Sequence, residues 1–263
     1  MALESDEETV DETYELAKQK IADWVSQDDP FLVLNLDNLR LIEIPPLPAN
    51  LRRLNCCGSW FYSLPTLPKD LTYLDCSACF NITALPELPE SLVYLDIEFC
   101  IVSVLPRLPS GLVYLNCGFN RLIGLPELPK SLRSLICRVN KLRSLPDLPL
   151  GLERLNCSKT LVTILPKLPA GLQKLDFSPG NLLCAPNIPL TLTTLEFDAF
   201  NNDNETFNRR QYLIGSVVKP AIKYICLTLK LWNVESQMRA IERKEAIFSE
   251  LMSRTLCPER TEI

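Results

Sequence analysis

Residues 105–125 read LPRLPSGLVYLNCGFNRLIGL, and this pattern recurs through the middle of the chain. Successive repeats lie 20 residues apart, except for one interval of 21 that places an extra residue near Phe80 and Asn81. A single unit of this length cannot bury its apolar side, so a fixed short period is typical of stacked units that share one core. The motif is L-P-x-L-P-x-x-L-x-x-L, and its copies begin at Ile44, Leu64, Leu85, Leu105, Leu125, Leu145, Leu165 and Ala185.

Each unit predicts one short strand and one extended return segment. The alternation across Leu115-Asn116-Cys117 is that of a strand with one side in the core. Sixteen of the 21 prolines occur in the paired L-P-x-L-P segments, where a fixed φ and a missing N–H favour polyproline-like backbone over helix. The Asn120 side chain is placed to bond neighbouring backbone inside the turn, and Cys79 and Cys100 take the same place in other units.

These motifs resemble the leucine-rich repeat family, specifically its short L-P-x-L-P class, found in bacterial secreted effectors of the YopM and IpaH type. The resemblance covers about residues 31–200. It implies a leucine-rich repeat solenoid: a curved parallel β-sheet of about nine short strands with a polyproline-like convex side. The concave sheet of this family usually binds protein. IpaH-type members add a ubiquitin-ligase domain with a Cys-x-Asp motif, which Cys226-Leu-Thr and Cys257-Pro-Glu lack, so ligase activity is not carried over.

The two ends of the array predict helical caps, because an open solenoid otherwise exposes its core. We divide the chain into an acidic leader with an N-terminal cap helix (1–30), the repeats (31–204, beginning near Phe31) and a C-terminal segment (205–263). A helical stripe runs through residues 6–27. The C-terminal segment predicts three helices, and whether they cap the repeats or bind separately stays open; the stretches are 205–214, 218–232 and 234–256.

Composition excludes several classes of function. The 263-residue chain has a net charge of −5, which argues against nucleic-acid binding, and it has no histidine to serve as a base or ligand. No apolar run is long enough for a membrane span, and the acidic start is unlike a secretory signal. Eleven cysteines without such a signal indicate reduced thiols in the cytoplasm, or in the host cytoplasm if the chain is a secreted effector. We expect no cofactor.

Candidate chemistry among the repeats has a structural explanation in each case. Cys76 and Cys79 form a C-x-x-C pair, but both fall in inward slots and the second pair that zinc requires is missing. Cys57 points outward and is a candidate reactive thiol. Asp75 and Asp96 lie on neighbouring strands of an open sheet, where we expect no desolvation that would separate their pKa values for acid–base catalysis. The sequence therefore predicts no enzyme and no metal site.

The outward strand positions are the candidate binding site. Side chains alternate across a strand, so the residues on either side of the inward leucine face the concave surface. Tyr73, Tyr94 and Tyr114 then form an aromatic strip about 10 Å long, of the residue type enriched at protein hot spots. Cross-strand packing that only stabilises the sheet is the alternative. The expected binding residues are Arg53, Asn55, Tyr73, Asp75, Tyr94, Asp96, Glu98, Tyr114, Asn116, Arg138, Arg154 and Lys174.

We interpret the chain as a non-enzymatic module that presents its concave face to another protein, as an effector acting on host proteins would. One alternative is the substrate-recognition part of a ubiquitin-transfer system that works with another catalytic protein. A third possibility is a structural one, in which the face stacks in an assembly. The sequence leaves the partner and the oligomeric state open.

Overall fold

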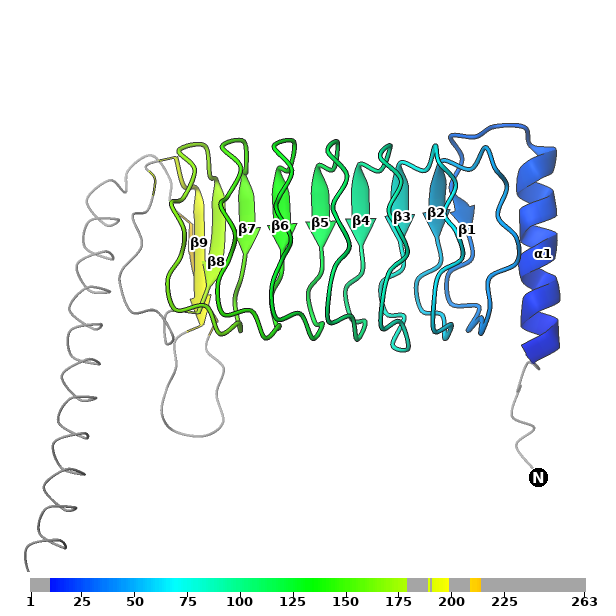
Figure 1. Cartoon of the computed structure of the whole chain (residues 1–263), viewed down its shortest axis with the longest axis horizontal. Helices are drawn as coiled ribbons and strands as arrows, with labels where there is room; N and C mark the ends of the chain where they lie inside the picture. The colour runs from blue at the N-terminus through cyan, green and yellow to red at the C-terminus, as the bar shows by residue number, and fades with distance from the viewer. Residues whose placement is uncertain (1–9, 179–188, 190, 199–208, 214–263) are drawn as a thin grey trace, which may run out of the picture.

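A computed structural model of the chain describes residues 10–178, 189, 191–198 and 209–213. One helix, α1 (Val10–Ser26), precedes a ten-stranded sheet whose strands follow one another in chain order (Figure 1). The first nine strands pair in parallel, and β10 pairs antiparallel to β9. The strands are β1 (Leu34–Asn35), β2 (Arg53–Asn55), β3 (Tyr73–Asp75), β4 (Tyr94–Asp96), β5 (Tyr114–Asn116), β6 (Ser134–Ile136), β7 (Arg154–Asn156), β8 (Lys174–Phe177), β9 (Thr194–Asp198) and β10 (Arg209–Leu213).

Equivalent residues of successive units pair with one another, which stacks the core. Leu95 pairs with Leu74 on one side and with Leu115 on the other, and all three are 0% exposed. Two residues on, a buried cysteine or isoleucine such as Cys117 or Ile97 continues the inward side. The apolar residues therefore form continuous ladders, and the predicted leucine-rich repeat solenoid is confirmed, including the inward register of Leu115.

The second proline of each pair forms a turn that leads into the next strand. The carbonyl of the second proline of a pair accepts a hydrogen bond from the N–H of the leucine three residues on, as Pro109 does from Leu112 at 3.1 Å. This is the bond of a β-turn, and proline suits it because the carbonyl is its one backbone hydrogen-bonding group. The same bond recurs at Leu71, Leu92 and Leu132.

In seven successive units, the residue three positions after the end of the strand adopts a left-handed backbone. In six of them the N–H donates to a carbonyl of the next unit, as from Phe119 to Arg138 at 2.9 Å, and in Lys159 it donates to the Ser178 hydroxyl, so the geometry extends the inter-unit ladder. Glycine and asparagine tolerate a positive φ best, and other residues lose about 1 kcal/mol there. The residues are Asn38, Gly58, Ala78, Phe99, Phe119, Val139 and Lys159.

The predicted inner turn bonds are also present. The Asn120 amide donates to the carbonyls of Ile97, Cys117 and Gly118, and its oxygen accepts the N–H of Val102 at 2.9 Å. In other units a thiol replaces the amide. Cys79 donates to the carbonyl of Cys56 at 3.3 Å, and Cys100 donates to that of Cys76 at 3.4 Å.

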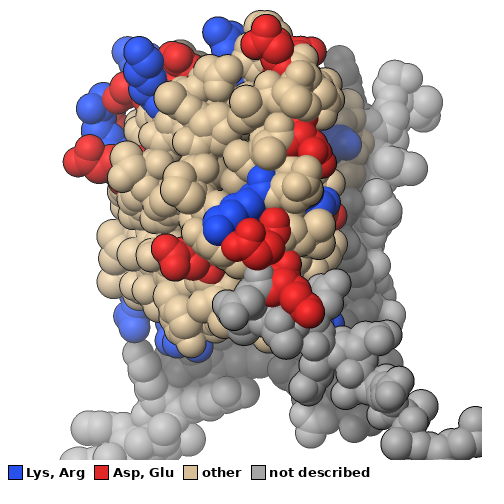
Figure 2. All heavy atoms as spheres, turned by 90° about the vertical axis from the view of Figure 1, so that its right-hand side faces the viewer, with Lys and Arg blue, Asp and Glu red and all other residues tan. Residues whose placement is uncertain are grey.

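Helix α1 covers the open N-terminal end of the core. Ala17 and Trp24 belong to the buried cluster, and the Trp24 indole donates to the carbonyl of Leu32 at 3.1 Å. Figure 2 faces this end and shows mostly uncharged residues, with the charged ones gathered in a band and along the margin. Within the described part of the chain, no helix combines the length and hydropathy that a bilayer span requires.

The inward ladder begins with Leu34, three residues after Phe31, which is 64% exposed beneath the guanidinium of Arg52. One expectation for the ends is wrong. The helix expected over 205–214 is instead β10 across Arg209–Leu213. A parallel sheet leaves unpaired backbone groups at its last strand, and pairing with β10 satisfies them in β9. The expected helices over 218–232 and 234–256 and the acidic start lie outside the described residues.

Candidate functional site

The side of the sheet that faces away from the core, which we call the concave face, carries three stacked tyrosines. The tyrosine strip consists of Tyr73, Tyr94 and Tyr114, which pair in register at the starts of β3, β4 and β5. Each successive pair of ring centroids lies 4.4 Å apart, with interplanar angles of 14° and 2°. The Arg53 guanidinium lies 5.3 Å from the Tyr73 ring centroid and extends the stack by one unit.

The rings of the tyrosine strip are half-buried against one another. Burial, together with the Asp96 carboxylate, raises the pKa of Tyr94 far above its ordinary value of 10.0. Burial also raises the pKa of Tyr73 and Tyr114. The phenols are therefore neutral at physiological pH, and they offer apolar rings with hydroxyl groups rather than a proton-transfer site.

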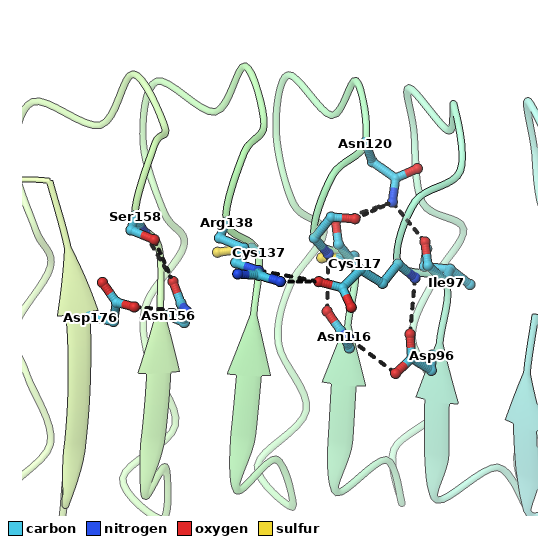
Figure 3. A network of polar contacts seen from close by, with 12 residues as sticks. Asp96, Ile97, Asn116, Cys117, Asn120, Cys137, Arg138, Asn156, Ser158 and Asp176 are labelled. Atoms are coloured by element: carbon cyan, nitrogen blue, oxygen red, sulfur yellow. Dashed lines mark hydrogen bonds and ion pairs between the residues drawn. The ribbon is translucent and has the colours of Figure 1, made fainter. Parts of the chain in front are cut away.

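The second outward column consists of the residues that directly follow the inward leucines, at or near the ends of the strands. In Asn55, Asp75, Asp96, Asn116 and Asn156 a side-chain oxygen accepts the N–H two residues on, as Asp75 does from Ser77 at 3.0 Å and Asn116 does from Gly118 at 3.2 Å. Ile136 takes the same position in β6 and has no such oxygen. Neighbouring members also bond across the strands, as the Asn116 amide does to Asp96 at 3.1 Å (Figure 3). These side chains therefore order the loops after the strands. The sequence-based expectation treated them only as exposed binding residues.

Asp96 departs most from the sequence-based expectation. It is 9% exposed, and its carboxylate accepts bonds from the Glu98 N–H, the Asn116 amide and the Tyr94 hydroxyl. Burial raises the pKa of Asp96 from an ordinary 3.8 to about 6, and the hydrogen bonds only partly oppose this shift. The expectation that no carboxylate here is desolvated is wrong, because Asp96 is buried beside the Tyr94 hydroxyl and the Asn116 amide.

The third outward column, two residues after the second, contains an ion pair that reaches across one unit to the next. Arg138 donates to Glu98 Oε1 from Nη2 at 2.8 Å and from Nε at 3.2 Å (Figure 3). Gly118 lies between them, and a Cβ there would approach Arg138 Cγ to 3.2 Å and Glu98 Oε1 to 3.3 Å. The glycine therefore leaves room for the bridge.

A second aromatic group follows the ends of the same strands. Phe99 and Phe119 occupy the left-handed position of their units, and their ring centroids lie 4.0 Å apart with an interplanar angle of 17°. The Arg138 guanidinium lies 4.6 Å from the Phe119 centroid. We call Phe99, Phe119 and the equivalent Val139 the rim strip. This strip was not identified from the sequence. A signal was available, because Phe99 and Phe119 align with Asn38 and Gly58 in other units, where a small or polar residue is found.

Apart from Arg53, the cations on the concave face outside the Arg138–Glu98 pair gather over β7 and β8. Glu98 is paired with Arg138, and Asp176 accepts a bond from the Asn156 amide at 3.0 Å. Among the described residues, Arg154 and Lys174 make no ion pair, and with Asn156, Asp176 and Thr194 they line a shallow hollow over β7 and β8. The concave face therefore changes from aromatic over β3–β5 to basic over β7–β8.

The eight cysteines that the structure describes are not activated. Burial raises the pKa of Cys57, which is opposite to the shift that a reactive thiolate needs. Cys117 and Cys157 are buried in the ladder, and burial raises the pKa of each to about 12. Within the residues that the structure describes, no group of side chains is placed to hold a metal ion.

The expected binding residues thus fall into three groups. Tyr73, Tyr94 and Tyr114 lie side by side, with Arg53 at one end and Arg154 and Lys174 beyond the other. Asn55, Asp75, Asp96 and Asn116 order the strand ends. Glu98 and Arg138 pair with each other.

Comparison with solved structures identifies similar repeat domains in bacterial effectors. YopM from Yersinia enterocolitica WA-314 is 36% identical over 64% of this chain and 42% of that chain, with a TM-score of 0.54. A Shigella effector leucine-rich repeat domain is 27% identical over 62% of this chain and 75% of its own, with a TM-score of 0.57. YopM from Yersinia pestis is 28% identical over 69% of this chain and 64% of its own, with a TM-score of 0.55.

No protein-family model and no curated protein sequence matches the chain. The chain matches 42% of the length of the first of these YopM structures, which is less than half. The chain carries a leucine-rich repeat domain that resembles those of YopM and IpaH-type effectors, a fold that supports a protein-interaction module.

Proposed function

We propose that the chain is a non-enzymatic module that binds a protein through the tyrosine strip and the basic residues beside it. The observation that carries this proposal is the stack of Tyr73, Tyr94 and Tyr114 at 4.4 Å spacing on an open sheet. Stacked rings lose little conformational entropy on binding, and tyrosine is among the residues that contribute most at protein interfaces.

The charges favour an acidic surface on the partner. Arg53 lies at one end of the strip, and Arg154 and Lys174 lie beyond the other. The nearby carboxylates of Asp96 and Glu98 are already engaged within the chain. A partner carboxylate would therefore meet unpaired cations, which speed association and orient the partner.

The biological setting follows as part of the same proposal. The resemblance to YopM and IpaH-type repeat domains favours an effector that acts on proteins of a host, in a reducing, cytoplasmic compartment. The eight free cysteines among the described residues suit such a compartment. No observation favours the alternative role in ubiquitin transfer.

The test replaces the strip and leaves the fold in place. The triple variant Tyr73→Ala/Tyr94→Ala/Tyr114→Ala should keep its secondary structure and lose at least about tenfold in affinity for a captured partner. Tyr62→Ala is the matched control, since Tyr62 is 68% exposed and lies outside the strip. Full binding by a folded triple variant would move the interface away from the concave face.

A further inference from the structure

The rim strip places large apolar side chains where the backbone favours small or polar ones. Asn38 and Gly58 fill this left-handed position in the first units, and both tolerate a positive φ. Phe99 and Phe119 fill it over β4 and β5, with φ angles of 56° and 51°. The fold is therefore served as well by asparagine or glycine here, and the aromatic rings call for another explanation.

The rings are also organised before any partner arrives. Phe99 is 40% exposed and stacks on Phe119, whose ring carries the Arg138 guanidinium. Two hydrogen bonds to one oxygen of Glu98 fix that guanidinium in turn. A rigid, partly exposed apolar surface of this kind binds with little loss of side-chain freedom.

Positive charge surrounds the strip. Arg121 and Lys141 follow Phe119 and Val139 by two residues, are exposed, and form no ion pair in the described parts of the chain. Glu98 is neutralised by Arg138. In a chain of net charge −5, this stretch of rim is locally basic.

We propose that the rim strip is a second contact site for the protein partner, and that it takes an acidic segment carrying an aliphatic or aromatic side chain. The inference rests on the proposed function, because the tyrosine strip lies at the other end of the same strands. A membrane is the less suitable occupant. The rings of Phe99 and Phe119 stack along the rim instead of projecting from it, and Phe119 is half-buried.

The test separates fold from binding by restoring the residue that the backbone prefers. Phe99→Asn/Phe119→Asn removes both rings and relieves two left-handed positions, so the melting temperature should stay near that of the unaltered chain. Phe80→Asn is the matched control, because Phe80 is 58% exposed but has no positive φ. The probes are random peptides displayed in a library and selected on the full chain, together with phosphatidylcholine vesicles containing phosphatidylserine.

Selected peptides should share an apolar residue next to Asp or Glu. They should bind the double asparagine variant at least about tenfold more weakly and the Phe80→Asn variant normally. Peptides that weaken only with the tyrosine triple variant would support the proposed function and overturn this inference. Peptides that bind the tyrosine triple variant and the double asparagine variant normally would contradict the proposed function and this inference alike, as would the selection of no peptide at all. If the chain binds vesicles but no peptide, and Phe99→Asn/Phe119→Asn abolishes the vesicle binding, the ligand of the rim strip is a lipid surface and the inference is overturned. A large drop in the melting temperature of Phe99→Asn/Phe119→Asn would show that the two rings stabilise the fold, and would overturn the inference.

Discussion

The two sides of β4 and β5 come from the same short stretches of chain but are specified in different ways. Inward, Leu95 and Leu115 repeat what every unit contains, and each is fully buried by its neighbours. Outward, Tyr94 and Asp96 depend on one particular neighbour: a tyrosine in register and an amide at 3.1 Å. The comparison teaches that the repeat determines the core, whereas the working surface depends on which units stand side by side.

The most damaging change should be a charge in the core. Leu115→Asp places an unpaired carboxylate where no solvent reaches and should cost about 3–5 kcal/mol or more, which unfolds the array. Circular dichroism during heating measures the loss. Val93→Asp is the control, since Val93 is 41% exposed on a neighbouring unit, and it should melt almost normally. Unchanged melting of Leu115→Asp would contradict the division into two sides.

The turn amide should come next in size. Asn120→Ala leaves the carbonyls of Ile97 and Cys117 and the N–H of Val102 without their buried partner, so we expect a loss of about 2 kcal/mol in a urea titration. Asn120→Cys should lose less, because Cys100 fills the same place and bonds the carbonyl of Cys76. If alanine and cysteine behave alike, the thiols do not substitute for the amide.

The ion pair that crosses a unit should matter less than the core. Gly118→Ala puts a methyl group between Arg138 and Glu98 and should cost about 1 kcal/mol through the displaced side chains. Gly124→Ala provides the comparison, because a Cβ at Gly124 would meet no atom within 4 Å. Equal urea midpoints for the two variants would show that the bridge adjusts without cost.

The last expected effect differs in kind, because it is a pH dependence from Asp96. Its pKa is raised from 3.8 to about 6 in the fold, so the folded state holds a proton that the unfolded state has lost. Its contribution is therefore fully present below about pH 4 and declines as the pH rises through about 6. Asp96→Asn should remove that decline in urea titrations taken across this range. A variant that keeps the full decline would show that groups other than Asp96 cause it.

Much of the architecture was predictable because the repeat states it many times. The spacing of Leu112 and Leu115 and the placement of Asn120 both follow from aligning the units with one another. The ends were harder, since they have no copies to compare. The helix expected over 205–214 is a strand at Arg209–Leu213, because an open sheet edge outweighed the local pattern.

By itself, the sequence determined that the chain is a leucine-rich repeat solenoid, which strand positions point inward, and that three tyrosines share one outward column. Only the tertiary structure decided how those outward residues behave. It buried Asp96 beside the Tyr94 hydroxyl, joined Glu98 to Arg138 across the gap at Gly118, and stacked Phe99 on Phe119. The physical reason is that periodicity reports which side of a strand a residue occupies. Burial, pairing and charge arise from contacts between units some 20 residues or more apart in the chain.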